Sequence, residues 1–104
     1  TEKKLVYVTS KMGSIDDNKG GGSYIYRSSK TALNSVVKSL SVDLACEGFS
    51  VAGVHPGWVR TDMGGPNGLI DVQTSVSGML AVIDGLSPDN AGDFFNYDGS
   101  LIPW

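Results

Sequence analysis

The sequence is poor in several residue types that would direct a chain to other classes of protein. Cys46 is the only cysteine among 104 residues, which excludes an internal disulfide. The longest uninterrupted apolar runs have about five residues, as at 79–83, far short of the roughly 20 needed to cross a bilayer. The 8 Lys and Arg residues are outnumbered by 11 Asp and Glu residues, and no basic cluster could neutralise a run of phosphates. We therefore expect no membrane span and no nucleic-acid partner.

The first residues also lack a targeting signal. Thr1 to Leu5 contain neither an apolar core nor a cleavage signature, and the chain starts on Thr1 rather than on methionine. With the lone cysteine, this favours a reducing, cytoplasmic setting. We interpret residues 1–104 as a single partial domain that has been cut inside a larger protein.

Hydrophobic periodicity predicts an alternation of strands and helices. Apolar residues at helical spacing, with Gly48 following as a cap, predict a long amphipathic helix over 23–47. A second helix is expected from Asp71, which can cap its start, to about residue 86. Short β-branched and aromatic runs predict three strands, the first of them buried on both faces. These strands are expected at 5–10, 50–55 and 93–97.

The order strand, helix, strand, helix, strand indicates right-handed crossovers and a parallel sheet with helices outside it. This is the pattern of one half of a doubly wound Rossmann sheet. Three strands and two helices make a thin core, and the first strand would be an exposed edge if nothing preceded it. Both features favour a missing amino-terminal half.

One pair of polar residues on the long helix suggests chemistry. Tyr26 and Lys30 are four residues apart, which places a phenol and an ammonium on one helix face near its start. The spacing by itself is weak, because a solvated helix face would also produce it. Ser10 closes the preceding strand and is favoured over Ser14 as a partner for this pair. Tyr24 has a serine rather than a lysine four residues later, so we interpret it as a packing or pocket-rim aromatic.

A third motif follows the second strand. The run His55-Pro56-Gly57-Trp58-Val59-Arg60-Thr61-Asp62-Met63 begins where that strand ends. Ser10 also follows a strand, so both segments are expected at the carboxyl ends of parallel strands. Open α/β sheets bind their ligands at this edge.

Together, the serine, the Tyr-x-x-x-Lys pair and the Pro-Gly-x-x-x-Thr run resemble the short-chain dehydrogenase/reductase family. The chain is also similar to the sniffer and C-factor group of carbonyl reductases in the sequences of residues 24–34 and 55–65 and in the ending Asn96-Tyr97-Asp98-Gly99. The resemblance covers the whole chain. The family's glycine-rich fingerprint, its Asn-Ala-Gly segment and the helix with a fourth catalytic Asn have no counterpart in the printed sequence.

The resemblance implies hydride transfer between a nicotinamide cofactor and a small carbonyl or alcohol substrate. Tyr26 would be the general acid, because hydride addition builds negative charge on the carbonyl oxygen that a proton must relieve. Lys30 would place a cation beside the phenol and bind the ribose hydroxyls, and Ser10 would hold the substrate oxygen. The expected catalytic residues are thus Ser10, Tyr26 and Lys30, and the expected cofactor contacts are Tyr26, Lys30, Pro56, Gly57, Val59 and Thr61.

Other conspicuous residues receive plainer interpretations. His55 is expected to be structural, since no second ligand or partner carboxylate accompanies it, and no metal site is implied. Cys46 is interpreted as a small buried apolar group. The segment 19–23 is interpreted as a flexible connector and 64–70 as a flexible polar loop. Trp58 fits either a pocket wall or ordinary packing.

The sequence therefore predicts the catalytic half of a carbonyl reductase. NADP(H) is the expected cofactor by family analogy, with NAD(H) as the second option, because the discriminating residue would lie on a missing strand. The alternative is a noncatalytic truncated member that acts as a binding or interaction module. Family members often pair through the equivalent of the 23–47 helix, so a homodimer is a further expectation.

Overall fold

The computed structural model describes residues 3–104 and contains the five predicted elements in the predicted order. The predictions about Thr1 and Glu2 lie outside the described residues. The strands and helices are β1 (Lys3–Val8), α1 (Tyr24–Asp43), β2 (Phe49–His55), α2 (Val72–Asp84) and β3 (Phe94–Asn96). Two short 3-10 helices, η1 (Lys11–Gly13) and η2 (Ala45–Glu47), lie in the connections.

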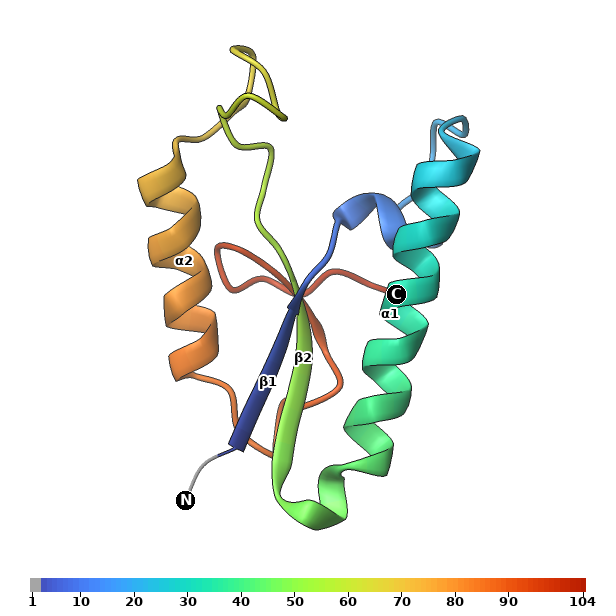
Figure 1. Ribbon diagram of the computed structural model, residues 1–104, viewed down its shortest axis with the longest axis vertical. Coiled ribbons are helices and arrows are strands. Elements are labelled where there is room, and N and C mark those ends of the chain that lie inside the picture. The colour runs from blue at the N-terminus through green and yellow to red at the C-terminus, as the bar shows by residue number, and fades with distance from the viewer. Residues whose placement is uncertain (1–2) are drawn as a thin grey trace.

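The three strands form one parallel sheet in the order β1-β2-β3. Leu5 of β1 lies opposite Val51 of β2, and Gly53 of β2 lies opposite Phe94 of β3. The two helices flank the strands on opposite sides, with α1 to the right and α2 to the left in Figure 1. This arrangement confirms the predicted half of a doubly wound sheet.

The fully buried strand is β2 rather than β1. Val51, Ala52 and Val54 expose at most 1% of their surface. The interior of β1 is only half-buried, and Val8 at its end is 58% exposed. The prediction that the first strand is buried on both faces was therefore wrong. The cause is its place at the edge of the sheet, where apolar residues are packed from fewer sides.

The core occupies both faces of β2. On one side, Ala52 and Val54 pack with Leu86 and Phe95, and side chains from β1 and α2 lie against this cluster. Elsewhere in the core, Phe94 stacks on Trp104 with ring centroids 5.1 Å apart. These contacts fix the strand ends from which the site residues emerge.

The long helix ends earlier than its apolar pattern predicts. It stops at Asp43, and η2 follows, closed by Gly48 with a φ of 85°, a left-handed conformation that glycine adopts without strain. Cys46 lies in this short turn and is exposed, so its interpretation as a buried residue was wrong.

The second helix starts as predicted. The backbone N–H of Thr74 donates to the Asp71 carboxylate at 2.7 Å. Hydrogen bonding with the side chain of Thr74 and then with its backbone N–H lowers the pKa of Asp71 below its usual value. No helix among residues 3–104 is long and apolar enough to cross a bilayer.

Candidate active site

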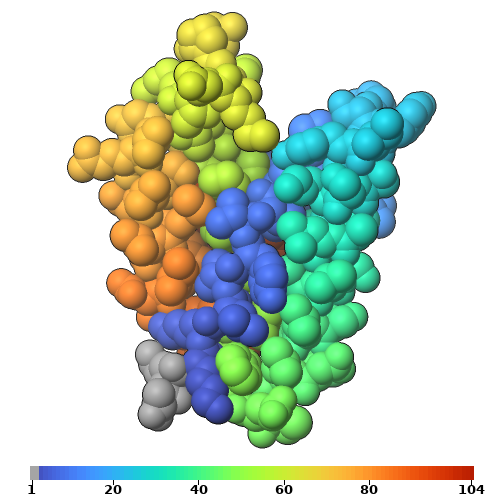
Figure 2. Space-filling view, viewed as in Figure 1, coloured from blue at the N-terminus to red at the C-terminus, as the bar shows by residue number. Residues whose placement is uncertain are grey.

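A cavity of about 1060 Å³ opens at the carboxyl ends of β1 and β2. Figure 2 shows the molecule hollowed at this end, between the 57–70 loop and the start of α1. Most of the predicted site residues line it, namely Ser10, Tyr26, Pro56, Gly57, Val59 and Thr61. The fold thus brings residues from three separate segments of the sequence to one cavity.

Ser10 lies in the cavity wall and Ser14 does not. Ser10 is 7% exposed and caps η1, where its hydroxyl oxygen accepts a hydrogen bond from the backbone N–H of Met12 at 3.1 Å. The hydroxyl proton stays available for a ligand oxygen. The Ser14 hydroxyl instead donates to the backbone carbonyl of Pro103. The geometry therefore favours the serine that the sequence favoured.

Two residues that sequence reasoning did not single out fix the strand end beside Ser10. The hydroxyl of Thr9 donates to the side-chain oxygen of Asn34 at 2.7 Å, and both residues are buried. Asn34 lies eight residues, or just over two helical turns, after Tyr26 on α1. No signal in the sequence predicted this contact, because it depends on the burial of Asn34, whose side-chain nitrogen has no partner among residues 3–104.

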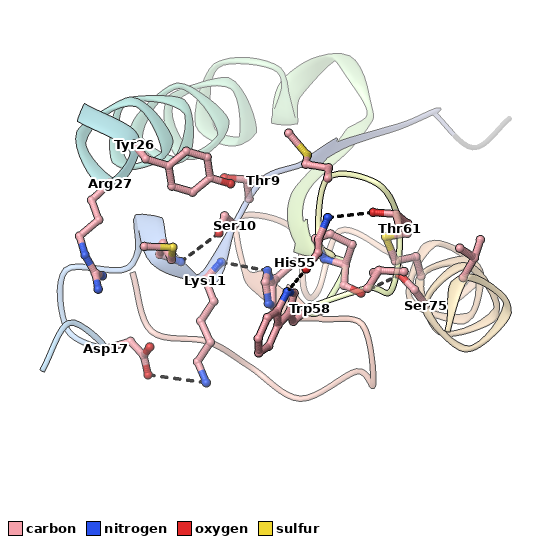
Figure 3. Close-up of a pocket in the computed structure, with 18 of the residues that line it drawn as sticks. Thr9, Ser10, Lys11, Asp17, Tyr26, Arg27, His55, Trp58, Thr61 and Ser75 are labelled. Carbon is pink, nitrogen blue, oxygen red and sulfur yellow. Dashed lines mark hydrogen bonds and ion pairs between the residues drawn. The ribbon is translucent and has the colours of Figure 1, made fainter. Parts of the chain in front are cut away.

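Tyr26 projects from the first turn of α1 into the cavity, and Figure 3 shows its hydroxyl directed toward Thr9 and Ser10. The ammonium of Lys30 lies 5.6 Å from the centroid of the Tyr26 ring. Lys30 is half-buried and stands behind the phenol rather than in the cavity wall. Tyr24 is 84% exposed and outside the cavity, so its interpretation as a packing or rim residue was wrong.

Gly13 allows η1 to lie directly against α1. A Cβ atom at this position would lie 2.8 Å from the backbone carbon of Lys30 and 2.7 Å from the side-chain nitrogen of Asn34. The hydroxyl of Thr31 donates to the Gly13 carbonyl at 2.8 Å, which fixes the same contact. The glycine three residues after Ser10 therefore sets the distance between the serine and the tyrosine helix.

The loop after β2 is held by its own hydrogen bonds. The backbone N–H of Arg60 donates to the Ile70 carbonyl at 2.8 Å, and that of Leu69 donates to the Trp58 carbonyl at 2.7 Å. The Trp58 indole N–H donates to the Gly64 carbonyl at 2.7 Å. The segment predicted to be a flexible loop is thus closed on itself, with Trp58 in the cavity wall.

Helix α2 anchors the start of this loop. The buried hydroxyl of Ser75 donates to the Pro56 carbonyl at 2.6 Å. Gly57 adopts a φ of 86°, and a Cβ there would lie 2.7 Å from the Ile70 side chain. The Pro-Gly pair therefore provides the turn that carries the chain from β2 across the cavity.

His55 joins the ends of β1 and β2. Its Nδ1 atom accepts a hydrogen bond from the backbone N–H of Lys11 at 3.0 Å. Burial lowers the pKa of His55, the Lys11 cation lowers it further, and Asp17 acts in the opposite direction. This contact gives the neutral imidazole a structural role. No group of three or more side chains suited to metal binding lies among residues 3–104.

The chain matches a known family over most of this region. The family described as short chain dehydrogenase matches residues 3–69, which is more than half of the chain. The chain therefore belongs to the short-chain dehydrogenase family. This finding confirms the resemblance predicted from the three motifs.

Comparisons of this chain with individual proteins also support its membership of the family. The chain is 53% identical over 102 residues to the protein named C-signal from Myxococcus xanthus, covering 98% of this chain and 61% of that protein. The carbonyl reductase Sniffer of D. melanogaster superposes with a TM-score of 0.93 at 44% identity, covering 97% of this chain and 41% of that one. An NADPH-bound carbonyl reductase from chicken fatty liver superposes with a TM-score of 0.88 at 36% identity, covering 97% and 42%. The chain thus spans about half the length of the proteins it matches.

Proposed function

We propose that this chain forms the catalytic, substrate-side half of an NADP(H)-dependent carbonyl reductase, with Tyr26 as general acid and base. The observation that carries the proposal is that Tyr26 and Ser10 line one cavity at the carboxyl edge of a parallel sheet. The NADPH-bound reductase among the similar structures supports the same activity and cofactor.

The residues suit the needs of carbonyl reduction. As the carbonyl carbon gains a hydride, its oxygen becomes negative and takes the proton of the Tyr26 hydroxyl, which yields the alcohol. The Ser10 hydroxyl donates a hydrogen bond to the same oxygen and stabilises its charge. The Lys30 ammonium, 5.6 Å from the centroid of the Tyr26 ring, is the cation that balances the negative charge left on the Tyr26 oxygen.

The loop after β2 fits a nicotinamide cofactor, which supplies the hydride when bound. Near Val59, the backbone N–H of Arg60 donates to the carbonyl of Ile70, and the N–H of Ile70 donates to the carbonyl of Trp58. Neither hydrogen bond uses the N–H of Val59. The Thr61 hydroxyl accepts from the backbone N–H of Gly64 at 3.1 Å, which leaves its proton for donation. We propose that these two donors bind the cofactor.

The first test is Tyr26→Phe in the protein at its natural length. Removing only the phenolic hydroxyl should lower kcat for carbonyl reduction by roughly 10²–10⁴-fold, while cofactor affinity stays nearly the same. The measurements are NADPH oxidation and NADPH binding by fluorescence. The matched control is Tyr24→Phe, which removes an exposed hydroxyl from the same helical turn. Activity of Tyr26→Phe within tenfold of the parent would refute its role as the acid.

A second variant in the same assay separates the role of Lys30 from that of Tyr26. Lys30→Ala should both weaken NADPH binding and slow turnover, because one ammonium would serve the ribose and the phenol. A purely kinetic effect with unchanged cofactor affinity would contradict the dual role.

A noncatalytic role is the second candidate. The protein of Myxococcus xanthus that is 53% identical is named C-signal, a name that describes a signal rather than a reductase. Absence of carbonyl reduction by the natural-length protein would favour this candidate.

The homodimer through the long helix also stays a proposal, supported by the exposed apolar side chains of Ile25, Val36 and Val42 on α1.

A further inference from the structure

The cavity wall has the opposite charge balance from the chain as a whole. Acidic residues outnumber basic ones by 11 to 8 in the sequence. Among the charged side chains that line the cavity, however, three are basic, Lys11, Lys19 and Arg27, and one is acidic, Asp17. The proposed reduction by Ser10, Tyr26 and Lys30 uses none of these four groups. They therefore require a separate explanation.

Arg27 is the most informative of these residues. It follows Tyr26 directly, and its Nε atom is buried without a hydrogen-bond partner among residues 3–104. Within the same described part of the chain, no carboxylate forms an ion pair with it. Arg27 is therefore a cation of the cavity wall whose charge no carboxylate among residues 3–104 neutralises, and such a charge attracts an anionic ligand.

The two lysines strengthen the positive potential at this end of the cavity. Lys11 pairs with Asp17 at 3.8 Å, and both side chains are about half exposed, so this pair is weak. Lys19 lines the cavity from the loop before α1. The net charge of the four lining groups is therefore +2, from three cations and one carboxylate.

The position of Arg27 separates it from the proposed cofactor contact Thr61. In the view of Figure 3, Arg27 and Asp17 lie to the left of Tyr26 and Ser10, whereas Thr61 lies to their right. A carbonyl group held by Tyr26 and Ser10 would thus have the donors of the 59–61 loop on one side and Arg27 on the other (Figure 3). The apolar side chains of Met12 and Trp58 also line the cavity and can contact the body of a substrate.

We propose that Arg27, assisted by Lys11 and Lys19, binds an anionic group of the substrate, so that the enzyme reduces carbonyl compounds that carry a carboxylate. This inference rests on the proposed reductase function and names its substrate class. Arg27 suits the role because a guanidinium binds a carboxylate through two parallel hydrogen bonds. Asp17 lowers the positive potential of the cavity wall and so weakens its attraction for the anion.

The experiment compares two aldehydes of the same shape and different charge. The probes are 4-formylbenzoate, which is an anion, and its neutral methyl ester, reduced by the natural-length protein with saturating NADPH. The parent should have a kcat/KM for the anion at least about tenfold above that for the ester, and added salt should reduce this preference by screening. Arg27→Gln should lower kcat/KM for the anion about tenfold and change that for the ester less than about twofold.

Three further variants make the test specific. Lys19→Gln should have a smaller effect of roughly two- to fivefold, since an exposed cation contributes less. Asp17→Asn should raise kcat/KM for the anion and leave the ester unchanged. Lys38→Gln removes the same charge from an exposed position of α1 outside the cavity and should change neither. Equal melting temperatures of the variants would exclude a general loss of structure.

The outcomes distinguish the inference from the function on which it rests. Turnover of both aldehydes without a preference for the anion would overturn the inference and leave the reductase function intact. Turnover of neither would overturn the reductase function and the inference together. If Arg27→Gln raised KM for NADPH, with KM for NADH and the aldehyde preference unchanged, the cations would bind the cofactor phosphate and the inference would be wrong.

Discussion

At the scale of single residues, the chemistry of the site depends on which hydroxyls face the cavity. Ser10 and Ser14 are only four residues apart, and Tyr24 and Tyr26 only two, yet one member of each pair lies in the cavity wall. The direction of the backbone at each residue decides which of the two side chains faces the cavity. Ser10 caps η1 from the end of the sheet, whereas Ser14 lies beyond that turn and donates to the carbonyl of Pro103.

The His55 contact predicts how stability depends on pH. The pKa of His55 is lower in the folded protein than the usual value of 6.5, so the unfolded chain binds the proton more readily. The contribution of His55 to stability is therefore full above about pH 6.5 and falls as the pH decreases below it, because burial and the Lys11 cation disfavour the charged imidazolium in the folded protein. Protonation of Nδ1 also removes the acceptor for the N–H of Lys11. The melting temperature should decrease between pH 7.5 and 5.5.

The comparison that isolates this effect uses the single histidine of the chain. His55→Asn keeps an acceptor near the same position but does not titrate, so its melting temperature should vary less over this range. The same decrease in both proteins would show that another group is responsible. The carboxyls of Asp71 and Asp98 do not interfere, because their hydrogen bonds to Thr74 and Ser100 lower their pKa values further from this window.

At the scale of elements, the site depends on how closely η1 packs against α1. Gly13→Ala would place a methyl group within 2.9 Å of Lys30 and Asn34, so the two elements would have to separate. We expect a loss of about 1–3 kcal/mol in the free energy of unfolding, together with lower activity, because Ser10 and Tyr26 stand on opposite sides of this contact. Urea denaturation of the natural-length protein measures the first effect.

Gly20→Ala is the matched control for this substitution. Nothing lies within 4 Å of a Cβ at Gly20, and its backbone does not require the left-handed conformation. The free energy of unfolding of this variant should stay within about 0.5 kcal/mol of the parent. Equal losses from both substitutions would contradict the packing explanation.

The elements also show what the sequence could predict. The order and type of all five were predictable, because apolar periodicity reports which face of a helix or strand is buried. The phase of α1 likewise placed Tyr26 and Lys30 on one face. The carboxyl end of α1, the exposure of β1 and the unpartnered Nε of Arg27 were not predictable, because each depends on which segments pack nearby.

At the scale of the whole molecule, the outer edge of β1 has no neighbouring strand among residues 3–104. An edge strand with unpaired backbone groups pairs readily with other chains. The printed sequence also contains no G-x-G-x-x-G fingerprint to receive a pyrophosphate at a helix start. We therefore predict that the 104-residue chain, expressed alone, self-associates and shows no measurable NADPH-dependent carbonyl reduction.

Size-exclusion chromatography and an NADPH oxidation assay on the same sample measure this prediction. The substrates should include aldehydes and ketones of varied charge, so that the selectivity proposed for Arg27 cannot hide an activity. The natural-length protein serves as the positive control. Robust turnover by a monodisperse 10.9 kDa monomer would show that these residues suffice for catalysis.

The self-closed loop between Trp58 and Ile70 has a consequence for how such a protein can diversify. Its two ends are joined by the bridge between Val59 and Ile70, and its internal hydrogen bonds return to residues of the same loop. The stretch between the bridge positions can therefore be replaced as a unit while the turn at Pro56 and the cap at Asp71 stay in place, provided that the new stretch also supplies a donor at Thr61. Single substitutions at Gly64 and Gly68 would instead clash with the backbone of Val59 and Arg60. Such a replacement of the whole stretch would change one wall of the cavity, which Met63 and Gly64 line, without changing the positions of Ser10, Tyr26 or Lys30.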